Sequence, residues 1–254
     1  MFYLINLFFV GFNFLYFYLI NKNILNPNLI HIFIIYTSIY LAVYLIFFLF
    51  SVFVLNQKKE FIKNFAIYFI YVISSILFFI FIRDDNIKIV FYIINILLTF
   101  LNFLSFKSKL VEKDNYFTQE ASYFTFLVSV FLFFSSIFAF YVFIGFNKLI
   151  ILLLSFVYFY LLYYLLYSSS PNDKKNLSRY IFISTLTSSE FLFILTYLPY
   201  SYYVRAILIL IFSFFISNFG KEALNNEVNK KYFNRAFITM VFLVIIVLIS
   251  AKTS

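Results

Sequence analysis

The sequence predicts an all-α protein, a polytopic bundle of transmembrane helices in which residues 1–254 form a single domain. Hydrophobic residues make up 65% of the chain and charged residues only 11%, which is more apolar surface than a soluble domain of this length buries in one core. The apolar runs are continuous rather than alternating, which favours helices over strands. Lys and Arg gather in alternate connections between these runs, a pattern typical of membrane topology.

The apolar runs predict about nine helices, with eight or ten as the alternatives. A helix needs roughly 20 mostly apolar residues to cross the roughly 30 Å hydrocarbon layer, where backbone polar groups must be bonded within the protein. The expected spans are residues 2–20, 30–55, 65–82, 89–106, 121–146, 149–167, 180–198, 202–219 and 236–251. Pro27, Pro171 and Pro199 interrupt three connections, and Gly220 stands where a helix C-cap is expected.

Charge asymmetry predicts the orientation. The connections on one side of the predicted bundle contain 13 Lys and Arg residues, and those on the other side contain 6. Cytoplasmic loops keep the excess of positive charge, so we expect the N-terminus in the cytoplasm and the C-terminus outside. The first span alone disagrees, because Lys22 follows it and no basic residue precedes it; the sum over four loops decides the prediction.

Several chemistries lack the residues that they need. There is no cysteine, hence no disulfide, thiolate nucleophile or cysteine metal site. His31, the only histidine, has no second ligand nearby, and no zinc-protease, serine-elbow or P-loop motif occurs. We therefore expect no catalytic residue, metal or other cofactor, and favour a protein that is not an enzyme. The basic residues lie in loops, so the expected partner is the lipid bilayer rather than nucleic acid.

Glu190 is the acidic residue that lies deepest in a predicted span. An ionised carboxylate at the bilayer centre costs roughly 2.5 to 3.5 kcal/mol, so Glu190 should be neutral, paired or facing a water-filled cavity. It is either a functional acid or a protonated carboxyl bonded to a neighbouring helix. Arg205 follows the turn at Pro199 and differs from Glu190 in depth by roughly 8 Å. It is expected either to pair with Glu190 or to extend to the headgroups among nearby tyrosines.

Two polar stripes are expected to face the interior of the bundle. Ser184, Thr187 and Ser188 share one helix face by their spacing, and such hydroxyls usually serve helix packing, with a substrate path as the alternative. A second stripe in the fourth span consists of Asn95, Thr99 and Asn102, preceded by Tyr92. Tyrosines at helical spacing, interpreted as core or interface residues, are Tyr36, Tyr40, Tyr44, Tyr160, Tyr163, Tyr164 and Tyr167.

The segment from Thr196 to Tyr203, the basic loop to Arg235 and the last apolar run resemble the C-terminal hairpin of uncharacterised polytopic membrane proteins from AT-rich, small-genome candidate-phyla bacteria. The resemblance covers about a third of the chain. It implies a bacterial inner membrane and no activity, so no functional residue is carried over. The high Phe and Tyr and low Gly content also fits a mitochondrially encoded protein, which makes the mitochondrial inner membrane the alternative location.

Three functions follow from these observations. The leading hypothesis is a multi-pass membrane protein that is not an enzyme and has a structural or assembly role. The second is a transporter or permease in which Glu190 binds a proton or cation, and this requires a polar cavity that reaches Glu190. The third is a lipid-modifying enzyme, whose charged groups would have to come from Arg83, Asp84, Asp85 or Glu120.

Overall fold

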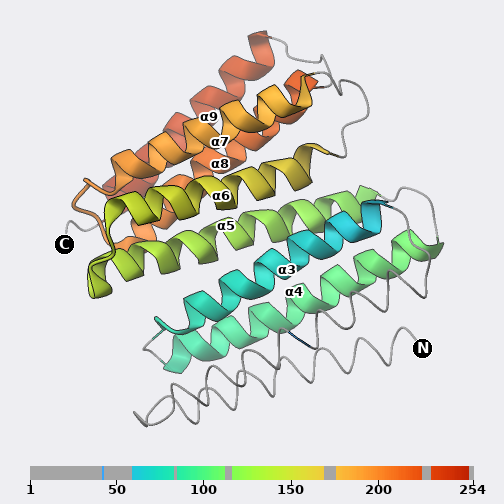
Figure 1. Cartoon of the computed structure of the whole chain (residues 1–254), viewed down its shortest axis with the longest axis horizontal. Helices are drawn as coiled ribbons and strands as arrows, with labels where there is room; N and C mark the ends of the chain where they lie inside the picture. Colours follow the sequence, from blue (N-terminus) through green and yellow to red (C-terminus); the bar gives the residue numbers. More distant parts are fainter. Residues whose placement is uncertain are drawn as a thin grey trace. The chain divides into compact units, whose positions relative to one another are not determined.

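The described part of the chain folds into seven α-helices in the computed structural model (Figure 1). The structure describes residues 59–82, 85–111, 116–168, 176–224 and 230–251, together with Ala42. The all-α prediction is confirmed for these residues. The first two predicted spans, apart from Ala42, and His31 lie outside them, so the total of nine helices stays a prediction.

Each predicted span from residue 65 onward corresponds to one helix. The helices are α3 Lys59–Phe79, α4 Asp85–Val111, α5 Tyr116–Ile144, α6 Lys148–Tyr167, α7 Leu177–Leu195, α8 Tyr202–Leu224 and α9 Lys230–Ser250. Among the described residues, four segments are long and apolar enough to cross a membrane: Glu120–Ile144, Lys148–Tyr167, Tyr202–Leu224 and Phe233–Ser250. The helix α7 is not one of the four, and it is the helix that contains Glu190 and the hydroxyl stripe.

Two short connections bring helix ends together. After α5 the chain turns at Gly145, whose φ of 73° lies in the left-handed region that glycine adopts without a steric penalty. Asn147 then caps α6, because its side-chain oxygen accepts a hydrogen bond from the backbone N–H of Leu149 at 2.9 Å. The connection from α7 to α8 contains Pro199 and ends at Ser201, whose hydroxyl accepts a bond from the N–H of Val204 at 3.4 Å.

The C-cap expected at Gly220 is wrong, because α8 continues through this residue to Leu224. Gly220 instead provides space between α8 and α6. A Cβ atom at this position would overlap the phenol group of Tyr167, which is completely buried. The glycine is therefore needed for close helix packing, a common use of small residues between membrane helices.

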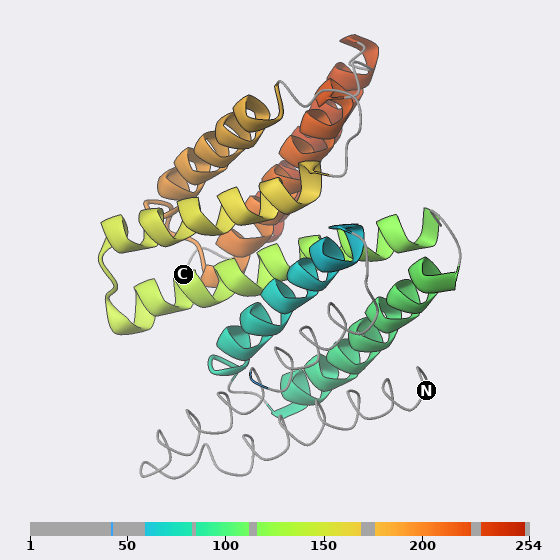
Figure 2. The same ribbon diagram turned by 45° about the vertical axis from the view of Figure 1, so that its right-hand side comes forward.

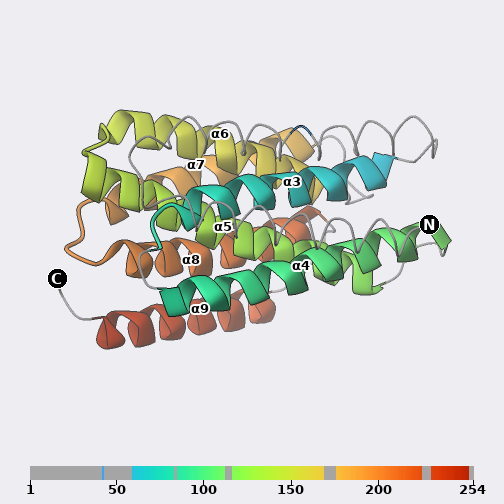
Figure 3. The same cartoon turned by 90° about the horizontal axis from the view of Figure 1, so that it is seen from below.

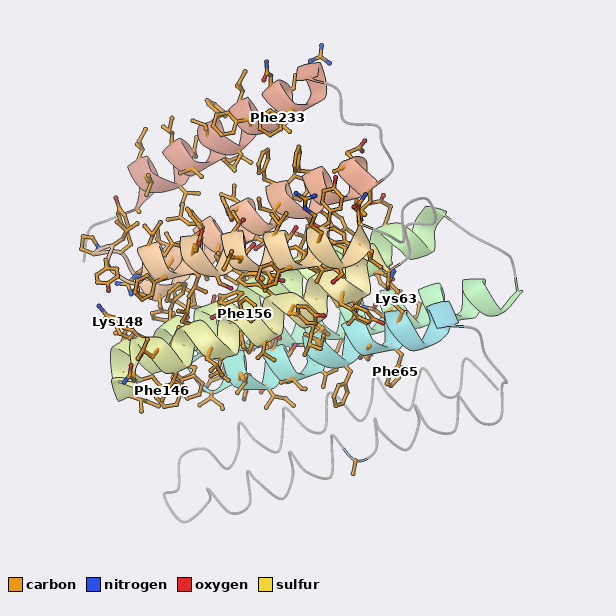
Figure 4. The ribbon with its side chains drawn as sticks, turned by 45° about the horizontal axis from the view of Figure 1, so that its top comes forward. Lys63, Phe65, Phe146, Lys148, Phe156 and Phe233 are labelled. Carbon is orange, nitrogen blue, oxygen red and sulfur yellow. The ribbon has the colours of Figure 1, made fainter. Side chains whose placement is uncertain are left out.

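The chain divides into two compact units, Met1–Thr125 and Phe126–Ser254, with the boundary inside α5. The expectation of a single domain stays a prediction. In the first unit α3 packs along α4 (Figure 2). In the second unit α6 packs on α7 and α8, α7 packs on α8, and α9 lies along α8 (Figure 3). Phe233 of α9, labelled in Figure 4, contacts the rings of Phe215 and Phe219 of α8.

Several helices expose large apolar side chains although the buried core is itself mostly apolar. In α4 the polar residues Asn95 and Asn102 are buried, whereas Ile93 and Leu97 are exposed. In α9 large apolar side chains are exposed along the helix, up to 80% for Ile249. Exposed apolar surface on this scale is unusual for a monomeric protein in water. Together with the four long apolar segments, it indicates a location in a membrane.

Candidate functional site

The helix α7 has two faces of different character. Its buried face consists of Ile181, Ser184, Thr185, Ser188, Ser189, Leu192 and Leu195. Its exposed residues include Phe182, Ile183, Leu186, Glu190 and Ile194. Because successive residues turn by about 100° around a helix, Glu190 lies about 160° away from Ser188. The acid and the buried hydroxyls therefore belong to opposite faces.

Glu190 is exposed in the C-terminal half of α7, and apolar residues of the same face flank it on the helix surface. Ile183, Leu186 and Ile194 of the same face are 48%, 41% and 58% exposed. Of the two alternatives for Arg205, the pairing with Glu190 is absent, since no ion pair joins these two residues, both of which the structure describes. The physical reason is that Arg205 is buried on α8, whereas Glu190 points away from the packing face of α7.

Two of the four buried hydroxyls of α7 bond to tyrosines of α6, whereas Thr185 donates to the carbonyl of Ile181 in its own helix and Ser189 Oγ has no hydrogen-bond partner. Ser188 Oγ lies 2.8 Å from the hydroxyl of Tyr163, and Ser184 Oγ lies 3.1 Å from that of Tyr167. Tyr167 also donates to the backbone carbonyl of Ile216 in α8 at 3.1 Å, so one phenol connects three helices. These are hydrogen bonds between packed helices, which is the structural use of such residues.

Thr187 does not belong to this contact, although the sequence groups it with Ser184 and Ser188. It is half-buried, and its hydroxyl donates to the carbonyl of Ile183 in its own helix at 2.8 Å. A helical turn of 3.6 residues places it at the edge of the buried face. Its backbone bond satisfies the hydroxyl without any neighbouring helix.

Arg205 is buried in the first turn of α8, with 8% of its surface exposed. Its guanidinium carbon lies 5.8 Å from the ring centroid of Phe138 and 6.0 Å from that of Tyr141, both in α5. Nε and Nη1 are buried and have no hydrogen-bond acceptor. Such cation–π contacts contribute about 0.5 to 2 kcal/mol and leave these two donors unsatisfied.

The polar stripe of α4 is buried in the first unit and bonds to its neighbours. The hydroxyl of Tyr68 donates to Thr99 Oγ1 at 3.1 Å, and Tyr71 donates to Asn95 Oδ1. Asn102 Nδ2 donates to the carbonyl of Leu98 at 2.8 Å and to Thr125 Oγ1 at 2.9 Å. The structure thus joins Asn95, Thr99 and Asn102 to α3 and α5.

One amide group in this network is incompletely bonded. Asn95 Nδ2 is buried and has no hydrogen-bond acceptor. The stripe is therefore a packing contact with one unsatisfied atom.

Sequence reasoning missed the partners of both stripes in the adjoining helices. Tyr68 and Tyr71 in α3 and Thr125 in α5 were not singled out, although the spacing of three between the two tyrosines puts them on one helix face. The pairing of Tyr163 and Tyr167 with Ser184 and Ser188 was also not predicted. Of the residues proposed for an enzyme, Arg83 and Asp84 lie outside the described ranges, and Glu120 is exposed on α5.

Comparison with known proteins identifies no similar protein. The chain matches no family model, no curated protein and no solved structure. The resemblance of the C-terminal third to membrane proteins of small-genome bacteria stays a prediction.

Proposed function

We propose that this chain is a multi-pass integral membrane protein that is not an enzyme and that serves in the structure or assembly of a membrane protein complex. We further propose nine membrane helices, a cytoplasmic N-terminus, and the inner membrane of a bacterium as the location. The four long apolar segments and the exposed apolar side chains support the membrane environment. The excess of basic residues in alternate loops supports the orientation.

The exposed carboxyl of Glu190 is the observation that carries the assembly role. An acid that faces hydrocarbon costs free energy, and a neighbouring helix with a hydrogen-bond donor or a positive charge removes that cost. The hydroxyls of Ser184 and Ser188 are already bonded to Tyr167 and Tyr163, so they are occupied in packing. Ser189 Oγ has no partner but is buried, so Glu190 is the exposed acid on this part of α7 that remains for a partner. We expect that partner to be a helix of another membrane protein with a basic or amide side chain at the same depth.

A photocrosslinking experiment in the native membrane tests this proposal. A photoreactive amino acid is placed at Leu186 or at Ile194, which flank Glu190 on the exposed face of α7. We expect each to form a product with a defined membrane protein, identified by mass spectrometry. The yield of these crosslinked products should fall several-fold when Glu190 is changed to Leu, because the carboxyl that binds the partner is then missing.

The matched control is Glu222→Leu, which removes a carboxyl from α8 and should leave the products unchanged. Products that persist at full yield in the Glu190→Leu background would contradict the proposal. Adducts to lipid alone would contradict it as well, because they would mean that no protein covers this face.

A further inference from the structure

Two cations lie near one tyrosine ring at the end of the second unit where α5 is followed by α6 and α7 by α8. Figure 4 shows Phe146 and Lys148 at the first of these turns. Lys148 Nζ lies 3.8 Å from the ring centroid of Tyr197 and 5.9 Å from that of Tyr141. The guanidinium of Arg205 lies on the same Tyr141 ring. We call the four residues Tyr141, Lys148, Tyr197 and Arg205 the cationic cluster.

The cationic cluster lacks an anion. Arg205 is more than nine-tenths buried, and its Nε and Nη1 have no acceptor. No carboxylate among the described residues forms an ion pair with Arg205 or Lys148, and a buried charge is normally paired. Ring faces attract cations but do not accept hydrogen bonds as an anion does. The cluster is therefore incomplete within the described part of the chain.

The chemistry of the cluster and its surroundings points to one ligand. An arginine fork and a lysine ammonium together are suited to a phosphate group. Tyrosines are abundant at this end, including Tyr200, Tyr202 and Tyr203, and such rings are typical of the headgroup level of a membrane. We propose that Arg205 and Lys148 bind the phosphate group of a phospholipid whose headgroup carries a net negative charge.

The side chains beside the cluster explain why the phosphate would belong to a lipid rather than to a free ion. Val142 and Phe143 of α5 and Leu149 of α6 are 51%, 51% and 69% exposed, and they provide an apolar surface for acyl chains. Lys148 is half-buried and Tyr197 is 61% exposed, so the cluster is open on the side of these two residues. A headgroup can reach the cations from there while its chains stay in the hydrocarbon.

Lipid binding to the full-length chain tests the proposal. The purified protein in a neutral detergent is titrated with phosphatidylglycerol, and bound lipid is counted by native mass spectrometry. We expect Lys148→Gln to weaken the tightest binding event about tenfold, because a hydrogen bond to a charged group is lost. Arg205→Lys should weaken it as well, because the charge remains but the fork is lost. If the Arg205 variants fail to fold, the lipid binding of Lys148→Gln alone tests the site, because Lys148 is only half-buried.

A control variant and a second lipid test the location of the site and the identity of the ligand. Arg179→Gln removes a positive charge at the exposed opposite end of α7 and should leave binding unchanged, and phosphatidylcholine should bind several-fold more weakly than phosphatidylglycerol. Equal binding by the wild type and Lys148→Gln, or an equal loss with Arg179→Gln, would overturn the site. Displacement of the lipid by millimolar inorganic phosphate would overturn the lipid assignment in favour of a free anion.

Discussion

Tyr71 in the first unit and Tyr163 in the second each make a buried polar contact between helices, but Tyr71 bonds to an amide and Tyr163 to a hydroxyl. In each unit the phenol of a tyrosine reaches from one helix to a small polar residue of a neighbouring helix. In the first unit Tyr71 of α3 meets the amide of Asn95 in α4. In the second unit Tyr163 of α6 meets the hydroxyl of Ser188 in α7. The difference lies in what the second residue can do when the tyrosine is removed.

A serine or threonine in a helix has an alternative partner, whereas an asparagine amide is harder to satisfy. Thr185 and Ser155 donate to the carbonyls four residues earlier in their own helices, at 2.7 and 2.6 Å. Such bonds are available to any helical hydroxyl. Asn95 has two polar atoms, and one is unsatisfied even in the intact network. The contact in the first unit should therefore be the more sensitive to a change of its tyrosine.

The largest expected effect comes from filling the space that α8 leaves for Tyr167. Gly220→Leu forces the phenol group out of its position and breaks its bonds to Ser184 and Ile216. We expect the free energy of unfolding to fall by about 3 kcal/mol, the upper end of the usual range for overpacking. Denaturant titration in micelles measures this loss. Adding Tyr167→Leu should recover part of this loss. If Gly220→Leu is neutral, α6 and α8 do not pack as described.

The second largest effect is expected at the contact between Tyr71 and the amide of Asn95. Tyr71→Phe leaves Asn95 without its hydrogen-bond donor, and we expect a loss of about 1 to 3 kcal/mol in the free energy of unfolding. The double variant Tyr71→Phe with Asn95→Leu removes both polar groups and should be close to the wild type. A double-mutant cycle measures this coupling. Simple additivity of the two changes would mean that the residues do not interact.

A smaller effect is expected in the second unit. In Tyr163→Phe the hydroxyl of Ser188 turns to a carbonyl of its own helix, so we expect a loss of only about 0.6 kcal/mol, the usual size of such a bond between membrane helices. The same unfolding titration compares it directly with Tyr71→Phe. A loss equal to or larger than that of Tyr71→Phe would remove the contrast between amide and hydroxyl contacts.

The smallest effect on stability is expected at Glu190. Because its side chain is exposed and has no ion-pair partner among the described residues, Glu190→Leu should change the free energy of unfolding of the isolated chain by no more than about 0.5 kcal/mol. In the photocrosslinking experiment, by contrast, the same substitution should lower the yield of crosslinked product. A loss well above this value in the isolated chain would mean that Glu190 is bonded within the bundle.

The sequence was sufficient for the positions of the helices in the described part of the chain. Apolar run length alone located α3 to α9, because backbone bonding in lipid leaves few alternatives to a helix. It did not locate all helix ends. Gly220 looked like a stop signal, but its small size serves the contact with Tyr167, and a contact between residues so far apart in the sequence leaves no local signal.

The candidate site was harder to predict for a geometric reason. Residue spacing showed that Ser184 and Ser188 share a face, and the same spacing puts Glu190 on the other side of α7. What spacing cannot supply is which face a neighbouring helix covers, because both faces of α7 contain polar residues. The position of Arg205 against Phe138 and Tyr141 could not be predicted either, since it depends on a contact between residues far apart in the sequence.

The face that α7 turns toward the lipid can be measured directly. The chain has no cysteine, so single cysteines at successive positions from 181 to 195 can each be labelled with a nitroxide and reconstituted into lipid vesicles. Spin relaxation by oxygen, which partitions into the bilayer, should be strongest at 183, 186, 190 and 194 and weakest at 184, 188 and 192. Maxima at 184 and 188 would mean that the hydroxyl face of α7 meets the lipid instead, and stronger relaxation by a water-soluble nickel complex along the whole helix would mean that α7 lies in water.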